Sequence, residues 1–300
     1  MPTVTPSGAI LGASITGIDL AVPLARGDFA LILRALATHG VVCFPDQRLD
    51  PASHAAFSRQ FGTLEVHVSG AFQVPEQPEV MILSNIVENG RPIGLADAGQ
   101  DWHTDMSFSR TIAFVNVLHA LKVPRRDGRV LGDTLFADMA AAFDGLPPAL
   151  QMRLEPLTAT HDFAKFWDMM RARGGEGSVR KPLTEAQRAQ KPPVSQPMVL
   201  RHPLSGRRIL YANPGYTMRV DGLPAGESDA LLETLFAHQR EPRYQYAHRW
   251  TEGDVLMWDN LRTMHYAVPD YGPNEHRLIR RCQAVADRVF EPEFAALAAA

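Results

Sequence analysis

The sequence is poor in the features that would place it outside the ordinary globular class. It has only two cysteines, Cys43 and Cys282, far apart in the chain. We interpret both as buried free thiols in a reducing compartment. No apolar run approaches the ~20 residues that span a bilayer, and the N-terminus has no basic stretch followed by an apolar one. We therefore expect a cytoplasmic protein that has no membrane partner.

An excess of charge of one sign is also missing. The 30 Lys and Arg residues face 33 Asp and Glu residues, which gives a formal net charge of −3. This balance gives no reason to expect binding to nucleic acid or to an anionic membrane. Any recognition of an anion should therefore be local and depend on a few placed arginines.

Short apolar and alternating runs between Gly- and Pro-containing turns predict a strand-rich chain. Helical spacing is found at 29–38, at 50–60, where Asp50 and Pro51 form a helix start, after 137 through about 154, and at 228–238. Strands are predicted at 41–44, 80–86, 112–121, 135–137, 198–201, 208–212, 244–250, 254–258 and 277–285. The pattern indicates one domain over 1–300, mainly β with flanking helices, folded as a sandwich or jelly roll.

Residues 168–197 differ from the rest of the chain. They are polar, basic and rich in Gly and Pro, with little core pattern. A segment of this length without a core pattern is either a mobile lid or a surface insertion, and the sequence leaves both open.

Most of the eleven histidines must be structural, but two of them have informative neighbours. His103 and Asp105 are two residues apart, so on extended backbone both side chains point to one face. A third ligand from a distant strand, such as His265, would complete two histidines and one carboxylate around a metal. This is the ligand set of non-haem Fe(II) oxygenases. Arg277 follows on another strand and is suited to binding a carboxylate in a bidentate manner.

These residues belong to a series of motifs that resembles the taurine dioxygenase / 2,4-dichlorophenoxyacetate dioxygenase (TauD/TfdA) family of 2-oxoglutarate-dependent oxygenases. The resemblance covers nearly the whole chain, in order. The matching pieces are Gly12–Leu20, Phe57–Gly62, Trp102–Asp105, Gly132–Thr134, His161–Phe163, His202–Gly206, Trp258–Asn260 and His265–Tyr271.

The resemblance implies a double-stranded β-helix core, which is a cupin-like jelly roll. It implies that His103, Asp105 and His265 bind Fe(II), and that 2-oxoglutarate and O2 are co-substrates. The far carboxylate of 2-oxoglutarate would then meet Arg277 and the Thr134 hydroxyl. The adjacent His276 makes the alignment at Arg277 ambiguous, although its side chain should point to the opposite face of the strand.

By the same resemblance, Arg281 and His67 match positions that bind a substrate anion. A surface salt bridge for Arg281 and an ordinary loop position for His67 are the alternatives. Phe108 and Phe163 match aromatic pocket positions, or else belong to the core. Gly99 stands where the taurine enzyme has an asparagine, which argues against taurine itself. The phrases around 136–139 and 259–265 look closer to the phenoxyalkanoate-cleaving members.

The implied function is hydroxylation of a small anionic substrate, an aryloxyalkanoate or a sulfonate, with release of succinate and CO2. If the hydroxylated carbon carries oxygen or sulfur, that bond would then break. Two alternatives remain open: desaturation or a biosynthetic oxidation of an amino-acid-like acid, and a jelly-roll metal-binding protein without activity. We expect a homo-oligomer, either a dimer or a tetramer.

Overall fold

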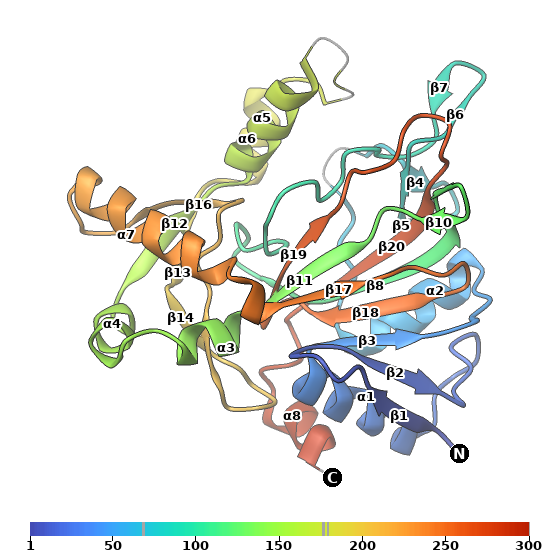
Figure 1. The fold of residues 1–300 in the computed structure, drawn as a ribbon, viewed down its shortest axis with the longest axis horizontal. Helices are drawn as coiled ribbons and strands as arrows, with labels where there is room; N and C mark the ends of the chain where they lie inside the picture. Colours follow the sequence, from blue (N-terminus) through green and yellow to red (C-terminus); the bar gives the residue numbers. More distant parts are fainter. Residues whose placement is uncertain (68–69, 176–177, 179, 300) are drawn as a thin grey trace.

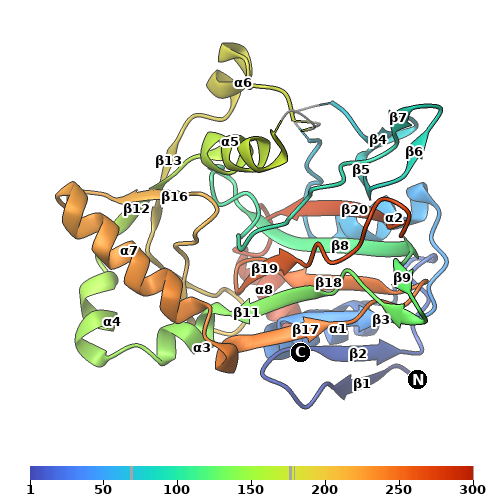
Figure 2. The same ribbon diagram turned by 45° about the horizontal axis from the view of Figure 1, so that its top comes forward.

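Two facing sheets organise the protein (Figures 1 and 2). The structure is a computed structural model, and it describes residues 1–67, 70–175, 178 and 180–299. The larger sheet has the strand order β1-β2-β3-β18-β8-β20-β5-β4, and the smaller sheet has the order β17-β11-β19. Strands of the larger sheet are β1 (Thr3–Pro6), β2 (Ala13–Thr16), β3 (Val41–Phe44), β4 (Gln73–Val74), β5 (Gln77–Ser84), β8 (Ala113–Lys122), β18 (Val255–Asp259) and β20 (Leu278–Val285). The smaller sheet is formed by β11 (Thr134–Asp138), β17 (Gln245–His248) and β19 (Thr263–Ala267).

In the described ranges, four further groups of short strands lie outside these sheets. They are β12 (Thr158–His161) with β13 (Val194–Pro197) and β16 (Thr217–Val220), the pair β14 (Val199–Arg201) and β15 (Arg208–Leu210), and the hairpins β6 (Val87–Glu88)–β7 (Arg91–Pro92) and β9 (Arg125–Arg126)–β10 (Arg129–Val130). Helices are α1 (Arg26–His39), α2 (Pro51–Ser58), α3 (Met139–Asp144), α4 (Pro148–Leu154), α5 (Phe163–Gly174), α6 (Glu185–Gln190), α7 (Ala225–Gln239) and α8 (Pro292–Ala299), with 3-10 turns η1 (Arg59–Phe61) and η3 (Pro242–Tyr244).

The central strand β18 shows how the two layers share the core. Successive side chains of a strand point to opposite faces. Val255 and Met257 pack on the side covered by helices, whereas Leu256 and Trp258 pack between the two sheets. All four are buried, so the strand is apolar from Val255 to Trp258 instead of alternating with polar residues.

Helices α1, α2 and α8 cover the outer face of the larger sheet (Figure 1). Asp50 caps α2 as the sequence predicts, because its carboxylate accepts a 2.7 Å hydrogen bond from the Ser53 backbone N–H. Helix α1 ends at Gly40, which has a positive φ of 68°. A left-handed residue at this position suits glycine and lets the chain turn directly into β3.

The predicted fold class is confirmed: the core is a β jelly roll with flanking helices. The predicted strands and helices are present, with ends shifted by a few residues. The short β12, β16 and β19 and the helices α5 and α6 were not predicted, because their apolar patterns are too brief or too polar.

The interpretation of Cys43 as buried is wrong, since it is only half-buried, whereas Cys282 is buried; both are free. No helix in the described ranges is long and apolar enough to cross a membrane.

A buried ion pair joins the smaller sheet to the helical layer. The Arg262 guanidinium donates to both carboxylate oxygens of Asp138, at 3.1 and 2.6 Å, and to the carbonyls of Ala37 and Thr38 at the end of α1. Asp138 in turn caps α3 by accepting from the backbone of Ala140 and Ala141.

We expect Arg262→Ala to lower the free energy of unfolding by about 3–5 kcal/mol, because it leaves the Asp138 charge buried and uncompensated. Arg153→Ala is the matched control, since Arg153 pairs with Glu227 at the surface and such a pair contributes about 0–1 kcal/mol. Denaturant unfolding of both variants measures the difference. Equal losses would contradict this account.

A second prediction concerns acid. Burial, with a smaller contribution from the Lys165 charge, lowers the pKa of His161 to about 3, while the unfolded chain binds the proton near pH 6.5. The neutral native histidine therefore contributes stability above pH 6.5, and that contribution is lost as the pH falls towards 3. The loss is about 1.4 kcal/mol per pH unit. In His161→Gln the fall in unfolding free energy between pH 6 and 4.5 should be shallower by about that slope; identical slopes would rule the explanation out.

Candidate active site

Three side chains from the metal-ligand prediction meet at the open end of the jelly roll. His265 is the central residue of β19, and His103 lies in an extended segment that pairs with it through a single antiparallel bridge. The His103 N–H donates to the His265 carbonyl at 3.1 Å, and the His265 N–H donates back at 2.9 Å. The two imidazole rings are therefore held with their centroids 4.1 Å apart.

Asp105 completes the group. One carboxylate oxygen lies 3.4 Å from His103 Nε2 and the other 3.5 Å from His265 Nε2. Asn260 fixes the backbone here: its amide oxygen accepts from the Asp105 N–H at 3.1 Å, and its amide nitrogen donates to the Asp105 carbonyl at 2.8 Å. All three side chains are buried, and their ligand atoms lie within 4.8 Å of one another.

The proton states of Asp105 and His265 suit a metal. His103 Nδ1 donates to the Asp101 carbonyl at 2.8 Å, so that the ring is oriented with Nε2 towards Asp105. Burial would raise the pKa of the Asp105 carboxyl, but the His103 hydrogen bond and the Arg281 charge hold it well below its usual range. Burial keeps the pKa of His265 well below its ordinary value. Asp105 therefore presents a carboxylate and His265 a neutral imidazole to the centre of the group.

A small cavity lies between the sheets behind these ligands, and Arg277 and Thr134 both line it. The Trp250 indole donates to Thr134 Oγ1 at 3.0 Å, so the hydroxyl proton remains available to a ligand. Arg277 is only 5% exposed. Within the described ranges, no carboxylate lies within ion-pair distance of its guanidinium. A buried, uncompensated cation calls for an anion.

The structure also separates Arg277 from His276. Arg277 and Ile279 are buried, whereas His276 and Leu278 are only half-buried. Arg277 and Arg281 line the same cavity. Arg281 is therefore not a surface residue: its side chain is 14% exposed and lies 3.7 Å from Asp105.

A second cavity opens in front of the metal-ligand group; it shares His103 and Arg281 with the rear one, and Asp105 lines it as well. His67, Phe108 and Phe163 line it as well, and the last two rings are 4.9 Å apart. Burial, helped by the charges of Arg281, Arg180 and Lys191, lowers the pKa of His67 to about 3. The imidazole is therefore neutral and sits in a positive environment.

Comparison with known proteins decides the family. The model of the family described as "Taurine catabolism dioxygenase TauD, TfdA family" matches residues 3–283. The chain belongs to the TauD/TfdA family.

Relatives of known name are similar along their full length. Pentalenolactone F synthase of Streptomyces avermitilis is 33% identical over 293 residues, which cover 95% of this chain and 94% of that protein. The alpha-ketoglutarate-dependent 2,4-dichlorophenoxyacetate dioxygenase of Cupriavidus pinatubonensis is 34% identical over 298 residues, covering 95% and 98%. The crystal structure of a taurine dioxygenase from Burkholderia xenovorans is 28% identical, with a TM-score of 0.76 and coverage of 95% and 90%.

TauD/TfdA proteins are Fe(II)- and 2-oxoglutarate-dependent oxygenases, so the chain is an oxidoreductase that uses Fe(II), 2-oxoglutarate and O2. A structural neighbour named AAD-2 was solved with Mn(II) and N-oxalylglycine; it has 26% identity and a TM-score of 0.76, covering 95% of this chain and 97% of AAD-2. The residues present fit both groups. The buried His, Asp, His set is the donor set that non-haem iron takes, and the uncompensated Arg277 guanidinium suits a dicarboxylate.

The sequence did not indicate several cavity residues of this TauD/TfdA protein. Arg180 and Lys191 line the front cavity from the segment 168–197, together with the aromatic rings of Phe166, Trp167 and Tyr216. Phe166 stacks on His103 with centroids 4.9 Å apart. The only signal for the two cations was the basic character of that segment.

The segment 168–197 is tied down beside the site. It comprises the end of α5, α6 and β13, while residues 176, 177 and 179 lie outside the described residues. Arg180 pairs with Asp97 at 2.7 Å, Arg173 with Asp101 at 2.7 Å and Lys191 with Glu65 at 2.9 Å. The first two partners belong to the loop that leads into His103.

Gly99 lies between the two cavities and lines both. Its φ is +71°, a conformation that side chains rarely adopt. A Cβ atom here would lie 3.4 Å from His103 Cε1. The absence of a side chain therefore widens the front cavity beside the metal ligands.

Proposed function

We propose that the chain hydroxylates a small aryloxyalkanoate-type acid, with His103, Asp105 and His265 as the Fe(II) ligands. The convergence of these three buried side chains at the boundary between the two cavities carries the proposal. Bound iron and 2-oxoglutarate supply the activation of O2, with succinate and CO2 as the co-products. The protein's own residues bind, orient and shield the reactants.

The rear cavity would take 2-oxoglutarate. Arg277 would hold the far carboxylate by charge, and Thr134 would donate its hydroxyl proton to the same group. The Trp250 hydrogen bond supports this role because it occupies an acceptor position of Thr134 Oγ1. The neutral walls of Leu83, Leu118 and Trp258 strengthen the attraction between the ions by excluding water.

The front cavity would take the substrate. Arg281 would bind the substrate carboxylate, and His67, being neutral, would contribute a hydrogen bond without adding a charge. Phe108 and Phe163 would pack against the aromatic ring. If the hydroxylated carbon carries the aryloxy oxygen, the product breaks down to a phenol and an oxo acid. Gly99 supports an aromatic substrate over taurine. Because it has no side chain, it leaves the front cavity wide and supplies no amide group.

A sulfonate could bind the same cationic side chains as a carboxylate. The 29% identity to a protein named putative alpha-ketoglutarate-dependent sulfonate dioxygenase supports sulfonates as a second substrate class. The similarity to pentalenolactone F synthase supports a biosynthetic oxidation of another small acid as a second function.

We further propose that residues 168–197 act as a lid whose Arg180 and Lys191 reach the bound anion. The full chain would act as one domain in the cytoplasm, where free Cys43 and Cys282 suit a reducing environment, and would assemble as a homo-oligomer.

The iron assignment predicts that His103→Ala and Asp105→Ala each weaken anaerobic Fe(II) binding by more than about 100-fold. Loss of a ligand should weaken binding more than loss of a residue that only supports a ligand. The visible charge-transfer band of the Fe(II)–2-oxoglutarate complex and the release of succinate should both disappear. His276→Ala, outside the cavities, is the control and should keep both. Succinate release that survives in either ligand variant would refute the assignment.

The two arginines should separate kinetically. Arg277→Gln should raise KM for 2-oxoglutarate by about 30-fold or more, because a buried charged partner is lost. Arg281→Gln should instead raise KM for the acid and leave that for 2-oxoglutarate nearly unchanged. Oxygen consumption with a panel of phenoxyacetates, with taurine as the comparison, measures both. If each variant changed both constants equally, the division into two cavities would be wrong.

A further inference from the structure

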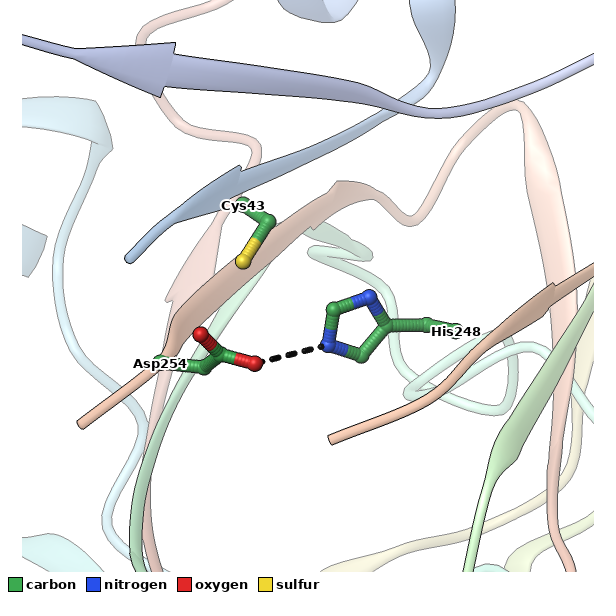
Figure 3. A group of neighbouring side chains, drawn as sticks. All are labelled: Cys43, His248 and Asp254. Carbon is green, nitrogen blue, oxygen red and sulfur yellow. Dashed lines mark ion pairs between the residues drawn. The ribbon is translucent and has the colours of Figure 1, made fainter. Parts of the chain in front are cut away.

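A second group of metal-ligating side chains lies away from the first. Cys43 comes from β3, His248 from the end of β17, and Asp254 from the turn before β18 (Figure 3). Their ligand atoms lie within 4.8 Å of one another. Figure 3 shows the thiol, the carboxylate and the imidazole directed at a common point. None of the three lines the two cavities of the active site.

Hydrogen bonding accounts for only part of this arrangement, because the Cys43 thiol bonds to Asp254, whereas the described residues leave one imidazole nitrogen without a bond. His248 Nε2 is buried and has no hydrogen-bond partner within the described ranges, although Asp254 Oδ2 is 3.4 Å away. That oxygen already accepts from the Thr251 N–H at 2.7 Å. Both side chains are more than nine-tenths buried, at 8% and 7% exposed. An unpartnered buried nitrogen destabilises a fold, so it needs an explanation.

The separation between the nitrogen and oxygen ligands suits a tetrahedral ion. With metal–nitrogen and metal–oxygen bonds of about 2.0–2.2 Å, two ligands at the tetrahedral angle lie roughly 3.3–3.6 Å apart. The 3.4 Å between His248 Nε2 and Asp254 Oδ2 falls in this range.

We propose that Cys43 Sγ, His248 Nε2 and an Asp254 carboxylate oxygen bind a borderline divalent cation of the zinc class, with water in the fourth position. The thiolate is the selective element, because soft sulfur favours zinc over magnesium or calcium. The triad at the active site has no sulfur, so the two sites differ in chemistry.

Binding exchanges a proton for the cation at Cys43. Burial and the neighbouring Asp254 carboxylate raise the pKa of the Cys43 thiol, so without a cation the sulfur stays protonated. The incoming ion forms a bond to sulfur and one thiol proton leaves to solvent. The half-buried position of Cys43 provides the route of entry.

The ion would tie the two sheets together. Cys43 and Asp254 stand on and beside strands of the larger sheet, and His248 stands on the smaller one. The His248 ring packs against Trp250 with centroids 4.9 Å apart, and Trp250 donates to Thr134. The site would thus hold β17 beside β11, the strand whose Thr134 lines the rear cavity.

Anaerobic titration of the full-length protein with Co²⁺ tests the proposal, because cobalt reports sulfur ligation by a near-ultraviolet thiolate-to-metal band. Wild type should bind two equivalents and show this band. The double variant His103→Ala/Asp105→Ala should bind one equivalent and keep the band. Cys43→Ser should also bind one equivalent but lose the band, and Zn²⁺ should abolish the band of wild type by displacing cobalt.

The control is Cys282→Ala, which removes the other thiol and should leave the band intact. Should Cys43→Ser fail to fold, His248→Gln keeps the sulfur and should weaken the band-forming equivalent by at least about 100-fold. The proposal is overturned if wild type shows no thiolate band, or if the band persists unweakened in either variant. These outcomes do not depend on activity, so they are independent of the proposed function.

Discussion

The pair of backbone hydrogen bonds between His103 and His265 is the contact on which the active site depends. It connects the end of a long loop to the central residue of β19, and it sets the distance between two imidazole rings before any metal is considered. Asp105 follows two residues later and is held by Asn260 from the other side. The ligand positions are therefore determined by the backbone and by one buried amide, which is how a site becomes organised in advance of its ligand.

Charge is the second constraint, because the interior contains more cations around the site than the metal ligands can balance. Asp105 faces Arg281, while Arg277 is buried behind it without an anionic partner in the described ranges. Arg180 and Lys191 are paired with Asp97 and Glu65 at the rim. The unbalanced charge is thus concentrated at two depths, and each depth corresponds to one of the two cavities. This division explains how one protein could bind two small anions, one in each cavity.

The smaller sheet connects the active site to the second cluster. Its central strand β11 carries Thr134, its strand β19 carries His265, and its strand β17 carries His248. Because Thr134 and His248 are opposite each other in the sheet, a change that fixes one affects the position of the other. The stability of this three-stranded sheet and the geometry of the rear cavity are therefore coupled through a few adjacent residues.

The sequence by itself determined the type of chemistry and the class of fold. His103 and Asp105 are close in sequence, so their shared face follows from local geometry, and the strand periodicity of 112–121 or 254–258 requires no knowledge of the partner strands. The family motifs, found in order along the chain, extended the predicted site to His265 and Arg277. Only the tertiary structure decided which distant residues became neighbours: Arg180 and Lys191 at the front cavity, Trp250 at Thr134, and Cys43 beside His248 and Asp254. The physical reason is that strand order and register bring these residues together, and no local pattern of apolar and polar residues encodes either.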